Sequence, residues 1–138
     1  MRYGLVGSEM CIRDSSRKVG NFVHEESREA TRSMFLNNPP EAVFVANDHM
    51  AFAVMDTLRY ELGLKIPDDV SVVGYDDVPA ASWPSYLLTT VQQPVNIMVR
   101  ETVEILIEKI ENPEARPQKI KVDGPLILRK SAKIHKGH

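Results

Sequence analysis

The sequence predicts an α/β fold whose strands form a mostly parallel sheet. Two short apolar runs, AVFVA at Ala42–Ala46 and VSVVGY at Val70–Tyr75, are rich in β-branched residues, as strands buried on both faces are. Each run follows a segment with helical periodicity, and only short connections separate helix from strand. Alternating helices and strands of this kind are typical of crossover units, which join parallel strands.

The first predicted helix begins near His24, in the stretch HEESREATRSMFLNN. Glu25 and Glu26 fall in its first turn, where negative charge interacts favourably with the helix dipole. Pro39 and Pro40 end the helix, because proline cannot continue the helical hydrogen-bond pattern.

The second predicted helix follows the first strand directly, in NDHMAFAVMDTLRYELG. Either Asn47 or Asp48 is suited to cap its N-terminus through a side-chain oxygen. Gly63 stands where a glycine commonly follows a helix end. The apolar residues fall on one helical stripe. They are Ala51, Val54, Met55, Leu58 and Leu62.

The later elements are less regular, apart from one long helix. A loop with two prolines follows the second strand, and LLTTV at Leu87–Val91 is the third predicted strand. A helix is expected over Val95–Ile110, with an apolar stripe on one face. Two short strands are expected at 118–122 and 125–129, and the tail 134–138 is expected to fray. The stripe consists of Val99, Val103, Leu106 and Ile110.

The composition is that of one domain with a hydrophobic core and little net charge. Of the 138 residues, 43% are hydrophobic, and 17 basic residues nearly balance 19 acidic ones. No basic patch is visible, so the composition gives no reason to expect direct nucleic-acid binding. Cys11 is the single cysteine and has no neighbouring Cys or His, so neither a disulfide nor a redox site is expected. No apolar run approaches the ~18 residues that cross a membrane.

Two polar residues stand where predicted parallel strands end. Asn47 follows the first strand and Asp76 follows the second, at the edge where open parallel sheets bind ligands. A carboxylate accepts hydrogen bonds from adjacent hydroxyls, and a carboxamide both donates and accepts, so the pair suits a neutral polyol, sugar or nucleoside. The alternative is that Asn47 and Asp48 only cap the helix, and Asp77 is interpreted as a loop residue.

No catalytic or metal-binding arrangement is recognisable in the sequence. No Ser, Cys or Lys lies in a nucleophile elbow, and the glycine motifs that bind phosphate are absent. The four histidines, His24, His49, His135 and His138, lack the spacing of metal ligands. We therefore expect no enzyme activity, no metal and no cofactor. Trp83 lies in the proline-rich loop, where an interface role is favoured over ligand contact.

One long segment resembles a known family. The segment Pro39–Pro94 contains ANDHMA, LGLKIPDDVSVVGYDD and LTTVQQP in that order, and it is similar to the core of bacterial transcriptional regulators of the lactose/galactose repressor (LacI/GalR) type. The resemblance extends to GNF at 20–22 and to PLILRKS at 125–131. It implies a periplasmic-binding-protein-like (type I) parallel sheet with flanking helices. The chain would hold a truncated form, the C-terminal subdomain with its return segments.

The resemblance implies that residues 16–133 form a partial effector-binding and dimerisation domain. Regulators of this type bind a sugar or nucleoside-like effector between two subdomains, act as homodimers in the cytoplasm, and have no membrane partner. They bind operator DNA through an N-terminal helix-turn-helix, which is missing here, as is most of the first subdomain. The alternative with the same fold is a sugar-binding receptor of a transporter, and a small enzyme is disfavoured.

The resemblance also implies roles for individual residues. Asn47 and Asp76 fall on positions that contact the effector, and Phe22 of GNF falls on the aromatic position that stacks against it. The helix after Asn47 and the loop with Trp83 fall at a dimer interface. The candidate interface residues are Phe52, Met55 and Trp83.

Two expectations concern the ends of the chain. In the family, the helix matched by Val95–Ile110 packs into the first subdomain, so here its stripe is expected to lack cover. Each apolar side chain left wet forgoes about 1.5–3 kcal/mol, so we expect the chain alone to fold poorly. Residues 1–15 are too interrupted by polar residues for a secretory signal. They resemble a peptide read from adapter DNA in environmental sequencing, and are expected to be an artefact.

Overall fold

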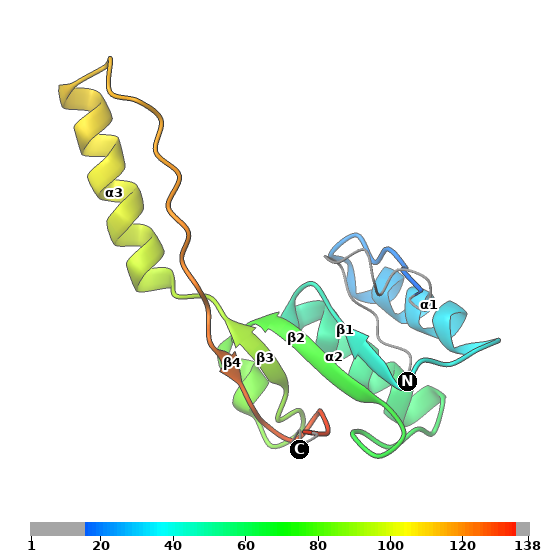
Figure 1. Cartoon of the computed structure of the whole chain (residues 1–138). Coiled ribbons are helices and arrows are strands. Elements are labelled where there is room, and N and C mark those ends of the chain that lie inside the picture. Colours follow the sequence, from blue (N-terminus) through cyan, green and yellow to red (C-terminus); the bar gives the residue numbers. More distant parts are fainter. Residues whose placement is uncertain (1–15, 135–138) are drawn as a thin grey trace.

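A computed structural model describes residues 16–134 of the chain, so the interpretations of 1–15 and of most of the tail fall outside the described residues. Helices and strands alternate through most of this range (Figure 1). The elements are α1 (His24–Phe35), β1 (Ala42–Phe44), α2 (Asp48–Asp56), the π-helical turn η2 (Thr57–Glu61), β2 (Ser71–Asp76), the 3-10 turn η3 (Pro79–Ser82), β3 (Thr89–Gln92), α3 (Val95–Glu111) and β4 (Leu126–Ile127).

The four strands form one sheet in the order β1-β2-β3-β4. β1, β2 and β3 are parallel, and β4 pairs antiparallel with β3, which confirms the predicted α/β class and mostly parallel sheet. The strand predicted at 118–122 is wrong. That segment runs beside α3 rather than beside a strand, so the described residues offer it no ladder to join (Figure 1). Of the strand predicted at 125–129, only Leu126–Ile127 pairs.

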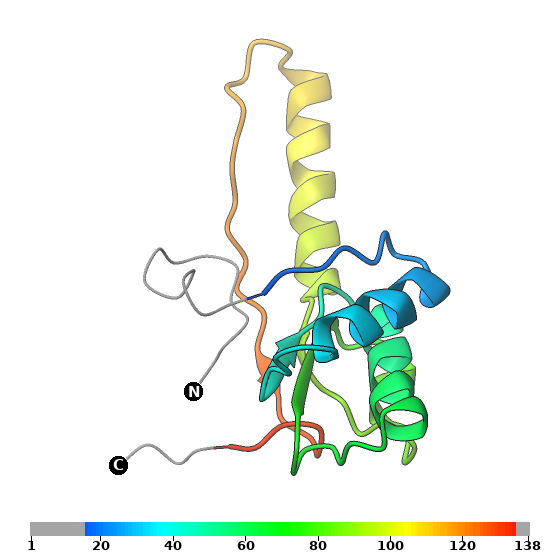
Figure 2. The same cartoon turned by 90° about the vertical axis from the view of Figure 1, so that its right-hand side faces the viewer.

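One face of the sheet carries the core. α2 packs on this face, and α1 packs against α2 (Figures 1 and 2). Met55, Leu58, Val72 and Leu88 are fully buried between α2 and the strands. The other face is only partly covered by the described residues, since Tyr75 of β2 is 37% exposed. The prediction that the strands are buried on both faces is therefore wrong for this part of the chain.

The ends of α2 follow the sequence prediction. Asn47 is the N-cap, and its Oδ1 accepts a hydrogen bond of 2.8 Å from the backbone N–H of Met50. The helix continues into η2, where the N–H of Leu62 donates to the carbonyl of Thr57. Gly63 follows with φ = 66°, a conformation that glycine adopts without strain.

An ion-pair cluster holds α1 against η2. The carboxylate of Glu61 lies 2.6 Å from Nη2 of Arg28 and 2.7 Å from Nε of Arg32. Hydrogen bonds lower the pKa of Glu61 to about 2, with the larger effect from Arg32 and the smaller from Arg28. The cluster therefore links α1 to the end of the helix formed by α2 and η2.

The helix α3 projects away from the sheet, and residues 112–125 run back along it (Figures 1 and 2). None of its 17 residues is buried. Within the described residues, this confirms that the apolar stripe of α3 lacks cover. The exposed fractions of the stripe are 56% for Val99, 47% for Val103, 55% for Leu106 and 78% for Ile110.

Candidate ligand site at the carboxyl edge of the sheet

The carboxyl ends of the three parallel strands bring polar side chains to one edge of the sheet. Asn47 follows β1, Asp76 ends β2, and Gln93 follows β3 directly. Asp76 is in register with Gln92 of β3, so the ends of these two strands lie side by side. The structure thus brings Asn47 and Asp76 to the same edge, as the sequence predicts.

Only one oxygen of the Asp76 carboxylate accepts a hydrogen bond from the described residues. The Nε2 group of Gln93 donates a hydrogen bond to its Oδ1. Its Oδ2 accepts no hydrogen bond from the residues that the structure describes. The backbone of Asp76 has φ = 118°, outside the conformations that non-glycine residues favour, and Asp77 follows with φ = 56°. An unusual backbone therefore sets the direction of this carboxylate.

Asn47 uses one half of its carboxamide for capping. Its Oδ1 is engaged with the N–H of Met50, whereas its Nδ2 donates to none of the described side chains or carbonyls. From the sequence, helix capping and ligand contact are alternatives for Asn47. The geometry makes them compatible, because capping needs the oxygen and leaves the two N–H donors for a ligand.

Phe22 lies on a tight turn beside the start of α2. The N–H of Val23 donates to the carbonyl of Gly20 at 2.9 Å, and both residues between them have positive φ, 48° for Asn21 and 59° for Phe22. Gly20 is buried, and a Cβ there would lie 3.0 Å from the Met50 side chain in the first turn of α2. The Phe22 ring is 76% exposed, so its face is open.

Sequence reasoning missed the part played by Asp48. This carboxylate is fully buried, with Oδ1 accepting from the Thr90 hydroxyl at 2.6 Å and Oδ2 accepting from the Val78 N–H at 3.0 Å. Burial raises the pKa of Asp48. A Cβ on Gly74 would lie 2.3 Å from Asp48 Oδ1, so only glycine fits beneath it. Asp48 is a structural group and leaves no surface for a ligand.

Asp77 is also engaged within the chain. Its carboxylate pairs with Nη2 of Arg129 at 2.7 Å and accepts a hydrogen bond from Nε2 of Gln92 at 2.8 Å. Arg129 in turn donates to the carbonyl of Leu88. This agrees with the interpretation of Asp77 as a loop residue, and it ties the segment after β4 to the end of β2.

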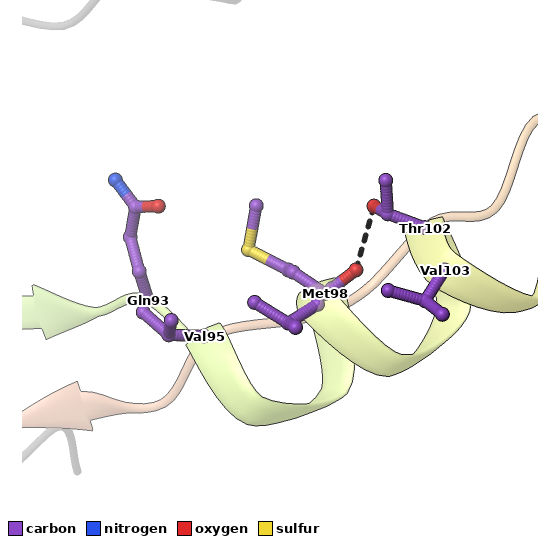
Figure 3. A pocket seen from close by; sticks show the side chains of 6 residues that line it. Gln93, Val95, Met98, Thr102 and Val103 are labelled. Atoms are coloured by element: carbon purple, nitrogen blue, oxygen red, sulfur yellow. Dashed lines mark hydrogen bonds between the residues drawn. The ribbon is translucent and has the colours of Figure 1, made fainter. Parts of the chain in front are cut away.

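An open hollow of about 320 Å³ adjoins this edge along the first turns of α3. Gln93, Met98 and Thr102 extend to the same side of the helix in Figure 3. Val95, Val99 and Val103 complete an otherwise apolar lining. Gln93 joins the hollow to the candidate site, because its amide also contacts Asp76. The hollow is one wall of a cleft and would need a second wall to enclose a ligand.

The three candidate interface residues differ in exposure. Trp83 is 58% exposed, on a loop that Arg59 of η2 holds through a 2.6 Å hydrogen bond to the carbonyl of Ser85. Phe52 is only 8% exposed and stacks on Tyr86, and Met55 has no exposed surface. Of the three, Trp83 is therefore the one with a large exposed surface, whereas Phe52 and Met55 are buried, and the interface role stays a prediction.

Neither a metal cluster nor a membrane helix is found in the described range. Between residues 16 and 134, no three His, Cys, Asp or Glu side chains lie together as metal ligands would. In the same range, no helix has the length and apolar character that crossing a bilayer requires.

Known proteins share this sequence and this arrangement. The family model described as "Periplasmic binding protein-like domain" matches residues 8–132. The repressor PurR of Photobacterium profundum is 34% identical over 115 residues, covering 83% of this chain and 34% of the relative. The ribose operon repressor of Escherichia coli is 35% identical over 123 residues, covering 88% and 37%. A solved complex of the transcriptional regulator CelR with cellobiose superposes with a TM-score of 0.76 at 29% identity, covering 88% and 38%.

The match includes the edge of the sheet and α3, since it runs through nearly all the described residues. The chain spans about a third of the length of the curated relatives it matches. Those relatives are transcriptional repressors. The chain therefore belongs to the periplasmic-binding-protein-like domain family, in the form found in transcriptional regulators of the LacI/GalR type.

Proposed function

We propose that this chain is the effector-sensing and dimerisation part of a LacI-type transcriptional regulator that responds to a sugar-like molecule. The observation that carries the proposal is the pair of partly engaged groups, Asp76 and Asn47, at the carboxyl edge of a sheet of this family. The sugars named for two relatives, ribose and cellobiose, support a neutral polyhydroxylated effector.

The chemistry of the edge suits such a molecule. Asp76 Oδ2 accepts from sugar hydroxyls, and the Asn47 amide donates to a hydroxyl or ring oxygen. The exposed ring of Phe22 stacks on the apolar face of the sugar. Arg129 is paired with Asp77, so its charge is compensated and is not directed at an anionic ligand. These groups form one wall, and the other wall belongs to the remainder of a longer regulator.

The hydrophobic face of α3 supports the same division. An exposed stripe of valine, leucine and isoleucine is costly in water, and α3 carries one along its whole length. We assign its cover to the part of the regulator that this sequence does not include. This is consistent with relatives about three times as long as the match.

The proposal assigns DNA binding and dimerisation to different parts of the longer regulator. Operator DNA is bound by a helix-turn-helix outside this sequence, in agreement with the net charge of −2. Homodimers form around the exposed Trp83, and the buried Phe52 and Met55 belong to the same region in this proposal. The regulator acts in the cytoplasm, where its operator is, and has no catalytic activity.

Calorimetry on a longer regulator containing this sequence tests the effector site. Ribose and cellobiose are titrated into the unmodified protein and into Asp76→Ala. We expect one of the sugars to bind, and the substitution to weaken its affinity at least about tenfold, because a charged hydrogen-bond acceptor is lost. The matched control is Asp123→Ala, whose side chain is 86% exposed on the segment after α3. Equal affinity in Asp76→Ala, or no binding of either sugar, would contradict the proposal.

The transporter receptor is the competing function with the same fold, and the repressor relatives do not favour it. A DNA-binding assay separates the two. The regulator binds an operator and its affinity changes when the sugar is added, whereas a receptor binds the sugar and leaves DNA untouched. A helix-turn-helix encoded about 200 residues upstream supports the regulator, and an export signal there supports the receptor.

A further inference from the structure

We propose that Asp48 is a positioning residue for the ligand site: it holds the turn that directs the Asp76 carboxylate, without touching the ligand itself. The inference rests on the proposed function, since it assigns the orientation of an effector-binding group to a second, buried carboxylate. It is based on two hydrogen bonds that Asp48 of α2 accepts, one from Thr90 of β3 and one from Val78 in the turn after β2.

The turn needs an external support. Asp76 and Asp77 both have positive φ, 118° and 56°, and neither is a glycine. Such backbone conformations cost free energy and persist where the surroundings hold them. Val78 ends this pair with ordinary extended backbone, φ = −65° and ψ = 154°. The backbone therefore returns to a relaxed conformation at the residue whose N–H is bound by Asp48.

Asp48 is itself held by burial and by two hydrogen bonds, so it can support the turn. It is fully buried, lies in the first turn of α2, and accepts a second hydrogen bond from Thr90 of β3, 42 residues away in sequence. Gly74 of β2 lies directly beneath it. Three elements thus fix the carboxylate, and its remaining oxygen is directed at Val78 N–H at 3.0 Å.

Two contacts then set the direction of the Asp76 carboxylate, one at the side chain and one at the backbone that follows. Gln93 donates to its Oδ1, and Asp48 fixes the backbone two residues after it. Removing Asp48 frees the Val78 N–H and lets the turn relax toward ordinary φ values. The relaxed turn directs the Asp76 side chain differently, so sugar affinity falls although every ligand-contacting residue is still present.

The test uses three variants in a longer regulator containing this sequence. Asp48→Ala removes both acceptors. Asp48→Asn keeps them in effect, because the amide oxygen accepts from Val78 N–H while its NH₂ donates to the Thr90 hydroxyl. The double variant Asp48→Leu with Thr90→Val replaces the buried polar pair by apolar groups. It replaces Asp48 and Thr90 together, so no hydroxyl is left unpaired, but it leaves Val78 N–H without an acceptor; urea titration measures the stability that remains.

Two readouts are taken: hydrogen exchange of the peptide with residues 76–80, and the dissociation constant for whichever of ribose or cellobiose the unmodified protein binds. In Asp48→Ala and in the double variant, we expect exchange to rise and affinity to fall at least about tenfold each. Asp48→Asn is expected to stay within about threefold of the unmodified protein on both.

A purely structural role for Asp48 predicts a different pattern. In that case the folded double variant stays within about threefold of the unmodified protein, both in exchange at 76–80 and in sugar affinity, and the proposal is overturned. The exchange readout decides whether Asp48 holds the turn even where neither sugar binds. Failure of the proposed function itself is recognised separately, by Asp76→Ala binding sugar as tightly as the unmodified protein.

Discussion

The helices α2 and α3 both carry apolar residues at helical spacing, but they differ in burial. α2 lies on the sheet, and most of its residues are buried, among them Ala51, Ala53 and Met55 at 0% exposure. α3 is almost twice as long and buries nothing. The comparison shows that an amphipathic pattern specifies a helix and a face, whereas the partner of that face is set elsewhere in the chain.

The difference also locates the expected weakness of the chain. From the sequence, the uncovered stripe at Val99–Ile110 leads us to expect poor folding of the whole chain. In the structure the longest uncovered stripe is on α3, whereas the core around Met55, Leu58 and Val72 includes no residue of α3. The poor folding of the chain alone stays a prediction, which cooperative thermal unfolding of the monomeric chain would contradict.

The largest expected effect comes from one matched pair of substitutions in the chain alone. Leu58 is fully buried, and Leu58→Ala is expected to lower the free energy of unfolding by about 2–5 kcal/mol through lost burial and a cavity. Leu106 is 55% exposed on α3, and Leu106→Ala is expected to change it by no more than about 0.5 kcal/mol. Urea titration followed by circular dichroism measures both. Equal losses of unfolding free energy in the two variants would contradict the difference in burial between the core and α3.

Ser131 gives the next largest effect. It is buried, its hydroxyl donates to the Val72 carbonyl at 2.6 Å, and the hydroxyl accepts from the Thr89 N–H at 2.8 Å, so it joins β2 to β3. Ser131→Ala leaves two buried backbone groups unpaired and is expected to cost about 1–3 kcal/mol. The control is Ser82→Ala on an exposed turn. A Ser131→Ala protein as stable as this control would show that the two hydrogen bonds of the Ser131 hydroxyl do not contribute to stability.

The ion-pair cluster gives the smallest effect and the one that depends on pH. The folded-state pKa of Glu61 is lowered to about 2, so its contribution is full above the ordinary value near 4.5 and is lost as the pH falls toward about 2. In Glu61→Gln this acid-side loss is expected to be smaller. Unfolding midpoints in urea at pH 5 and pH 3 measure it, with Glu111→Gln at the end of α3 as the control. An unchanged pH dependence in Glu61→Gln would contradict the assignment.

The sequence predicts the elements well because their signals are local. Periodicity predicts α1, α2 and α3, and single positions predict Gly63 after the helix and a cap at Asn47 or Asp48, of which the structure shows Asn47. The predicted end of the second strand is enough to place Asp76 at the carboxyl edge of the sheet. The pairing of Asp48 with Thr90, of Asp77 with Arg129, and of Ser131 with Val72 escapes such reasoning, because each joins residues far apart in sequence.

Two failures have the same origin. The strand predicted at 118–122 has a suitable composition, but pairing requires a neighbouring strand that the described residues do not supply. Burial of β2 on both faces requires helices on both sides, and α2 covers only one.

Phe22 is identified only through the resemblance, since an exposed aromatic residue on a turn carries no local signal of ligand binding.

We propose, as the central claim, that this chain joins a sheet-and-helix unit, which bears one wall of an effector site, to α3 and residues 112–125, which the rest of a longer regulator covers. Hydrogen exchange at residue resolution, in the chain alone and in a longer regulator containing it, tests this directly. We predict slow exchange in α2 and β2 in both proteins, and exchange in α3 that is fast in the chain alone and slow in the regulator. Equally fast exchange of α3 in both proteins would contradict the claim.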